Sequence, residues 1–138
     1  MRSVYRYLVA VLFVAILAQI GFAGYGAFNA IHAAAHHRVT KKTIENGFDI
    51  HGAVGSVIVI ALVLLLVMSL IGRCEVKYTG ILAALGVLQA VLGAVSTSVP
   101  ALGFLHALNA LAILGLTAWL AHKTWRAQRR SSGPPAPA

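Results

Sequence analysis

The stretch that decides the fold runs from residue 78 to residue 122: YTGILAALGVLQAVLGAVSTSVPALGFLHALNALAILGLTAWLAH. It contains no Lys, Arg, Asp or Glu. At about 1.5 Å of rise per helical residue, a chain of this length can cross a hydrocarbon core of roughly 30 Å twice. The run STSVP at 96–100 holds turn residues and a proline that cannot continue a helix. We therefore predict two membrane spans, at 78–98 and 101–122.

Two further charge-free stretches precede this one. No charged residue lies between Arg6 and Arg38, which predicts a first span at 7–31. The apolar part of a cleaved signal peptide is shorter, about 7–15 residues, so we expect this segment to be retained. The next stretch without charge predicts a span at 50–72.

The composition is typical of a membrane protein. Of the 138 residues, 59% are hydrophobic and 10% are charged, whereas a soluble domain carries about 25% charged residues. We predict an all-α fold, a four-helix transmembrane bundle over residues 1–130, followed by a disordered Pro/Ser/Gly tail at 131–138. The single cysteine, Cys74, excludes an internal disulfide, a CxxC redox motif and the CxxCH haem attachment motif. Any cofactor must therefore be held by other side chains.

The basic residues predict the orientation in the membrane. The formal net charge is +8, and eight of the basic residues flank the spans on the side of the two termini: Arg2, Arg6, Arg73, Lys77, Lys123, Arg126, Arg129 and Arg130. The opposite side holds three: Arg38, Lys41 and Lys42. This asymmetry predicts that both termini are cytoplasmic, in a bacterial cytoplasmic (inner) membrane. Because the basic residues are distributed as topology determinants, we expect no nucleic-acid binding.

Membrane helices pack through small residues and polar contacts. The third predicted span carries a stripe of small residues at steps of three and four: Ala83, Gly86, Ala90, Gly93 and Thr97. We interpret this stripe as a helix-packing face. Gln19 and Gln89 lie near the middle of the first and third spans. They are either interhelical hydrogen-bond partners or part of the lining of a cofactor pocket.

Two histidines are expected at the same depth in the membrane. His51 is the second residue of the second predicted span and His106 is the sixth residue of the fourth. Both spans run inward from the outer side, so both imidazoles are expected within two turns of the outer surface. An ionisable residue at this depth is a functional hypothesis by default. A haem b iron held by both imidazoles would satisfy them; alternatively, His51 is interfacial and His106 is hydrogen-bonded to a backbone carbonyl.

Other residues are candidates for the surroundings of such a haem. Gly55, Gln89 and Asn109 are predicted to line the pocket, and Arg38 to pair with a propionate. His32 and His36 stand four residues apart, which places them on one helix face and suggests a separate metal site. Alternatively, these two histidines form a polar cap to the first span.

The residues around the histidine pair resemble a known family. The stretch LQAVLGAVSTSVPALGFLHALNALAILGL at 88–116 is similar to part of one half of haem A synthase, where a Gln-x-x-x-Gly run, a Pro-containing turn and a haem-ligating His follow one another. The resemblance implies these roles for four residues: Gln89, Gly93, Pro100 and His106. The segment FDIHGAVG at 48–55 is similarly placed to the second-span ligand, here His51. As a whole, from MRSVYR through PALGFLHALNAL, the chain more closely resembles a family of uncharacterised bacterial four-span membrane proteins.

The resemblance to haem A synthase is incomplete. That family also needs carboxylates in the first outer loop and a second haem site from its other half. Here the outer side holds only Glu45 and Asp49 as acids, and the chain offers one histidine pair. The resemblance therefore does not extend to oxidation of a haem methyl group by a single chain.

Three functions are compatible with these features. The first is a membrane b-type haem protein with bis-His ligation near the outer face, which transfers electrons or handles haem. Its partners would be a quinone, a redox protein or a second copy of the chain in a homodimer. The second is a haem-modifying enzyme related to haem A synthase. The third is a structural or assembly subunit without haem, in which the histidines only form hydrogen bonds.

Overall fold

The computed structural model describes residues 2–36 and 39–131, and these residues form four α-helices and no strand. The helices are α1 (Arg2–His36), α2 (Lys41–Gly72), α3 (Val76–Ser96) and α4 (Leu102–Ser131). Each is long and apolar enough to cross a membrane. The prediction of an all-α, four-helix membrane bundle is confirmed. The predicted propionate partner Arg38 and the tail beyond Ser131 lie outside the described residues.

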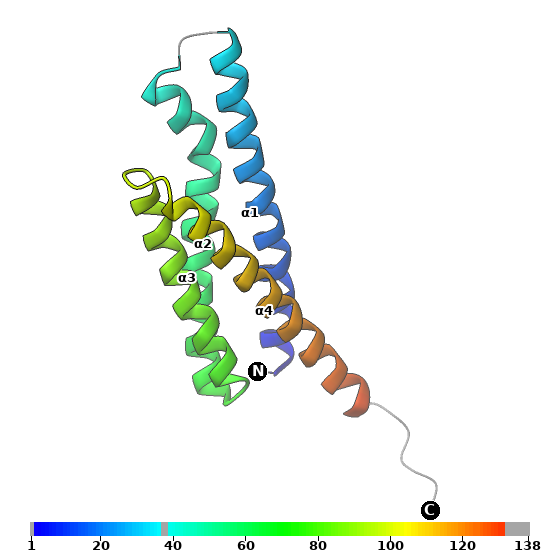
Figure 1. Cartoon of the computed structure of the whole chain (residues 1–138). Helices are drawn as coiled ribbons and strands as arrows, with labels where there is room; N and C mark the ends of the chain where they lie inside the picture. Colours follow the sequence, from blue (N-terminus) through cyan, green and yellow to red (C-terminus); the bar gives the residue numbers. More distant parts are fainter. Residues whose placement is uncertain (1, 37–38, 132–138) are drawn as a thin grey trace, which may run out of the picture.

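The helices form a ring in which each one packs against two neighbours. Helices α1 and α3 both contact α2 and α4. Within the described ranges, the backbones of the diagonal pairs, α1 with α3 and α2 with α4, do not come close to each other. Helix α4 crosses the bundle obliquely, from the far end of α3 to the beginning of α1 (Figure 1). We call the end that holds the beginning of α1, the α2–α3 turn and the end of α4 the terminal end. The opposite end is the distal end, where α1 and α2 extend beyond the α3–α4 turn (Figure 1).

Local sequence explains where the helices begin and end. Helix α2 begins at Lys41, nine residues before the predicted span, because Thr40 caps it: its Oγ1 accepts a hydrogen bond from the Thr43 backbone N–H at 3.2 Å. A charge-free stretch of sequence identifies only the part of a helix that lies in lipid. It does not detect a polar extension of the same helix, such as the one that Thr40 caps. The break expected around Pro100 is observed, since α3 ends at Ser96 and α4 begins at Leu102.

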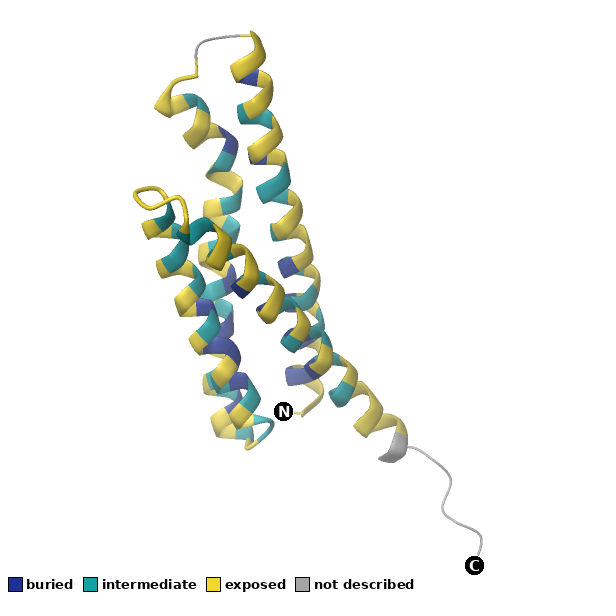
Figure 2. Ribbon diagram, in the orientation of Figure 1, coloured by how far each residue is buried: buried dark blue, intermediate teal, exposed yellow. Residues whose placement is uncertain are grey.

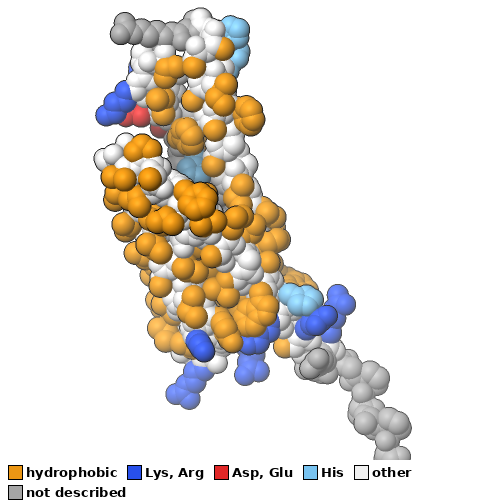
Figure 3. All heavy atoms as spheres, viewed as in Figure 1, with side chains coloured by type: hydrophobic (Ala, Val, Ile, Leu, Met, Phe, Trp, Pro, Cys, Tyr) orange, Lys and Arg blue, Asp and Glu red, His pale blue; other side chains and the backbone are white. Residues whose placement is uncertain are grey.

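The buried core is small and lies mainly toward the terminal end. Its fully buried side chains include Val9, Leu62, Leu65, Leu82 and Leu120. In Figure 2 the buried residues lie along the inner faces of the helices, with exposed residues around the outside. Hydrophobic side chains cover much of the face shown in Figure 3, and large hydrophobic residues are exposed on all four helices, as expected for helices in contact with lipid. The chain is therefore a multi-pass membrane protein.

Small residues allow close helix packing at particular points. A Cβ on Gly26 of α1 would lie 2.8 Å from the backbone oxygen of Gly47 in α2. The backbones of these two helices are therefore in direct contact at this point. In the predicted stripe on α3, Ala83 and Gly86 are buried, whereas Ala90 and Thr97 are exposed. The helix-packing interpretation is correct for Ala83, Gly86 and also Gly93, which lies against His106 of α4, and it is wrong for Ala90 and Thr97. Steps of three and four drift around a straight helix, and α4 crosses α3 obliquely rather than following its length.

Candidate functional site

The structure brings His51 and His106 together across the bundle. His51 lies on α2 and His106 on the diagonally opposite α4, and both side chains are half-buried. Their ring centroids are 6.2 Å apart, with 62° between the ring planes. His51 is ten residues into α2, deeper in its helix than the predicted span boundary implies. Because α2 extends beyond the α3–α4 turn, this position is level with the beginning of α4.

Each imidazole is held by a backbone carbonyl of the adjacent helix. His51 Nδ1 donates to the Gln19 carbonyl oxygen on α1 at 3.1 Å. His106 Nδ1 donates to the Gln89 carbonyl oxygen on α3, also at 3.1 Å. A carbonyl oxygen can only accept, so Nδ1 carries the proton in both rings. In a neutral imidazole the Nε2 lone pair is then the one that can bind a metal, and a carbonyl partner at Nδ1 is the usual support of a metal-binding histidine.

A chain of amides continues from His106. Gln89 Nε2 donates to His106 Nε2 at 3.0 Å. Asn109 Nδ2 donates to Gln89 Oε1 at 2.7 Å and to the Leu85 carbonyl oxygen at 2.9 Å. The second bond orients the Asn109 amide, which in turn orients the Gln89 amide. The structure thus places the predicted pocket residues Gln89 and Asn109 beside His106, where they hold its lone pair in a hydrogen bond.

Gln19 of the α1–α2 hairpin is arranged differently from Gln89 of the α3–α4 hairpin. Gln19 Nε2 donates to the His51 carbonyl oxygen at 2.6 Å, and its Oε1 is buried without a hydrogen-bond partner. Within the described ranges, no hydrogen bond to His51 Nε2 is found. The two hairpins therefore share the carbonyl contact to Nδ1 and differ at Nε2. Sequence reasoning identified Gln19 as a polar residue at mid-span, but nothing in the sequence paired it with His51.

Two glycines make room for these contacts. A Cβ on Gly93 would lie 3.1 Å from His106 Cε1, and a Cβ on Gly55 would lie 2.8 Å from Gln19 Nε2. Gly93 therefore allows the His106 ring to reach the α3 backbone. Gly55, predicted to line a haem pocket, instead accommodates the Gln19 amide. Its small size serves the polar contact between α1 and α2.

The distance between the two rings matches that of two imidazoles on one metal ion. Two imidazoles that bind one metal ion from opposite sides, each through a bond of about 2 Å, have ring centroids about 6 Å apart. His51 and His106 stand at 6.2 Å, and each has its proton on the nitrogen that faces a carbonyl. For His106 to bind iron, the Gln89 amide must turn away from Nε2. Within the described ranges, the buried Oε1 of Gln19, like His51 Nε2, has no hydrogen-bond partner.

The alternative metal site is not completed by the fold. The His32 and His36 rings lie 4.6 Å apart on α1, and both are exposed. Across residues 2–36 and 39–131, no group of three or more His, Cys, Asp or Glu residues is arranged to hold a metal ion. This pair therefore has no third protein ligand in that part of the chain. A bis-His haem needs only two protein ligands, so the same criterion does not address His51 and His106.

The acidic residues of the distal end are not part of the histidine cluster. Glu45 forms an ion pair with Lys41 at 3.5 Å along α2, and Asp49 is exposed. In the described ranges, neither carboxylate is hydrogen-bonded or ion-paired to His51 or His106. The described residues therefore give the two imidazoles no carboxylate partner for proton transfer.

Comparisons with models of known protein families, with curated proteins and with solved structures found no match to this chain.

Proposed function

We propose that this chain is a membrane b-type haem-binding protein in which His51 and His106 are the two axial ligands, and that it transfers electrons or handles haem in a bacterial cytoplasmic membrane. The observation that supports this most directly is the pair of imidazoles at 6.2 Å, each with Nδ1 bound to a backbone carbonyl. The resemblance of residues 88–116 to one half of haem A synthase supports the same ligand pair.

The protein's own groups would set the properties of such a site. The carbonyls of Gln19 and Gln89 fix the tautomer of each imidazole and increase its basicity as a ligand. The hydrogen bond from the Gln89 amide to His106 Nε2 would have to be released for that nitrogen to serve as a ligand, so ligand binding would compete with an internal contact. When bound, a haem with two protein ligands supplies one-electron transfer and has no open position for oxygen.

One bound haem near the outer face reaches only part of the way across the bilayer. An electron carrier of this kind therefore needs a partner, either a membrane quinone or a second redox protein. A homodimer would bring together two identical sites. With no carboxylate bound to the imidazoles in the described ranges, haem modification is less well supported than electron transfer or haem binding.

The experiment is the reduced-minus-oxidised visible spectrum of the purified full chain, expressed with an adequate haem supply. We expect a Soret band and sharp α and β bands typical of low-spin bis-His haem. His51→Ala and His106→Ala should each abolish or strongly weaken these bands. His122→Ala is the matched control, because His122 is exposed at the terminal end of α4, and it should leave the spectrum unchanged. Colourless wild-type protein would refute the proposal.

A second function has one specific observation in its favour. Gln89 already satisfies the Nε2 lone pair of His106, so this half of the cluster is complete without any cofactor. This arrangement suits a structural or assembly subunit, in which the histidines only join helices. In that case the protein is colourless, and His106→Ala lowers the thermal stability of the bundle with no spectral change.

A further inference from the structure

A cavity opens at the terminal end of the bundle, away from the histidine pair. Its volume is about 610 Å³. The beginning of α1, the α2–α3 turn and the end of α4 surround it, and its charged lining residues are Arg2, Arg6, Arg73, Glu75 and Lys123. Four basic groups thus face one acidic group. We call this space the Arg6 cavity.

Arg6 is buried in the wall of this cavity and incompletely paired. Its residue is only 6% exposed, and its Nε has no hydrogen-bond partner. The guanidinium carbon lies 4.4 Å from the ring centroid of Trp125 and 4.8 Å from that of Tyr7. These two rings are perpendicular to each other, at 90°, so the guanidinium can stack face to face on only one of them. A guanidinium has five N–H donors, and contacts with aromatic rings do not pair its charge with an anion.

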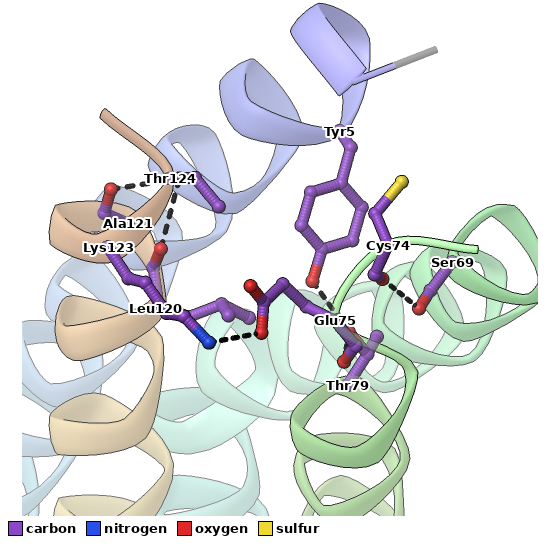
Figure 4. Close-up of polar contacts among 9 residues, drawn as sticks. All are labelled: Tyr5, Ser69, Cys74, Glu75, Thr79, Leu120, Ala121, Lys123 and Thr124. Carbon is purple, nitrogen blue, oxygen red and sulfur yellow. Dashed lines mark hydrogen bonds and ion pairs between the residues drawn. The ribbon is translucent and has the colours of Figure 1, made fainter. Parts of the chain in front are cut away.

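Within the described residues, acidic side chains leave the arginines of this cavity unpaired. It has only three acidic residues, and Glu75 is the one at this end. Glu75 is already bound to Lys123, with 2.7 Å between the carboxylate oxygen and Nζ. In Figure 4 the Lys123–Glu75 pair lies beside Tyr5, whose hydroxyl contacts Thr79 at 2.6 Å. Within residues 2–36 and 39–131, the arginines of the cavity form no ion pair.

Membrane topology alone does not account for this arrangement. Basic residues that determine orientation act from the aqueous boundary, and an exposed side chain such as Arg129 is sufficient for that role. Burial of a guanidinium with an unpaired donor is unfavourable unless a ligand completes it. Arg6 is buried beside a cavity whose charged lining residues are mostly basic, and this combination favours an anionic ligand there.

We propose that the Arg6 cavity binds a phosphate group, either in the headgroup of an anionic phospholipid or in a soluble phosphate compound at the membrane surface. The planar fork of a guanidinium matches the oxygens of a phosphate. Arg6 provides a buried guanidinium in the cavity wall, while Arg2 and Arg73 supply charge from the exposed rim. This site is independent of the histidine pair, which lies toward the opposite end.

The test uses the full chain, purified in an uncharged detergent, with three probes: phosphatidylglycerol, phosphatidylcholine and inorganic phosphate. Native mass spectrometry measures retained lipid, and thermal unfolding measures stabilisation by each probe. We expect saturable binding of phosphatidylglycerol, with weaker binding of phosphatidylcholine because its choline cation offsets the phosphate charge. Competition by inorganic phosphate indicates a site for soluble phosphates, and its failure to compete indicates a lipid headgroup site.

Variants locate the binding. Arg6→Gln should weaken the binding of the preferred probe by about tenfold or more, the loss expected for a charge-assisted hydrogen bond. Arg73→Gln, at the exposed rim, should weaken it by roughly twofold to fivefold. Arg129→Gln removes the same charge from an exposed position outside the cavity and should change binding by less than about twofold. If Arg6→Gln does not fold, Arg73→Gln against Arg129→Gln decides. Equal binding of the two lipids, or equal effects of the cavity and control variants, would overturn the proposal.

Discussion

Gly93→Ala tests the contact that positions His106. The added Cβ would lie 3.1 Å from His106 Cε1 and 3.4 Å from Nδ1, closer than ordinary van der Waals contact of about 3.5–4 Å. The ring must therefore move by a few tenths of an ångström away from α3. This movement lengthens the 3.1 Å hydrogen bond from Nδ1 to the Gln89 carbonyl oxygen. We expect the contact to weaken while the helix stays intact.

The magnitude follows from opposing contributions. Loss of one hydrogen bond costs about 1 kcal/mol, and mild overpacking costs roughly 1–3 kcal/mol. Replacement of glycine by alanine within a helix contributes about 1 kcal/mol in the other direction. The net loss of unfolding free energy should therefore be about 1–3 kcal/mol. The matched control is Gly115→Ala on α4, where a Cβ would meet nothing within 4 Å, and it should not destabilise the protein.

The assay is nitrogen NMR of histidine side chains in the detergent-solubilised chain, together with its unfolding free energy. In Gly93→Ala the ring-nitrogen signals of His106 should shift toward those of a weaker hydrogen bond, and those of His51 should shift much less. In Gly115→Ala neither histidine should change. Unaltered His106 signals in Gly93→Ala would show that this glycine does not set the position of the ring, and the reasoning about the site geometry would be refuted.

Two further substitutions test the packing of the bundle. Gly26→Ala places a Cβ 2.8 Å from a backbone oxygen of α2, so it should force α1 and α2 apart and cost roughly 1–3 kcal/mol of unfolding free energy, whereas Gly21→Ala, with nothing within 4 Å, should cost none. Tyr5→Phe removes the buried hydroxyl that bonds Thr79 at 2.6 Å and should cost about 1 kcal/mol in a denaturant titration. Tyr25→Phe is its control, because Tyr25 is 59% exposed; equal losses in the two tyrosine variants would contradict the importance of the buried bond.

The two hairpins present their histidines in similar ways with one informative difference. In both, an imidazole Nδ1 donates to the carbonyl of a glutamine on the preceding helix. The Gln89 amide covers His106 Nε2, whereas the Gln19 amide bonds the His51 backbone instead. Within the described ranges, His51 Nε2 therefore lacks the amide contact that His106 Nε2 makes.

The sequence by itself determined the number and approximate position of the helices. Charge-free length and the break near Pro100 are local properties, and they predicted four spans that the structure contains. Local rules missed the extension of α2 back to Lys41, because a hydropathy window does not register a helix cap at Thr40. The orientation of the termini across the membrane stays a prediction from charge.

Only the tertiary structure decided which side chains meet. His51 and His106 were expected at equal depth, but helix rotation decides whether two rings at one depth face each other or lipid. That rotation depends on contacts distributed over the whole chain, such as the approach of Gly26 to Gly47 and the fit of Gly93 against His106. The burial of Arg6 has the same origin, since the sequence identifies it only as a basic residue near a span. Its neighbours Trp125 and Arg73 come from distant segments that the fold alone brings beside it.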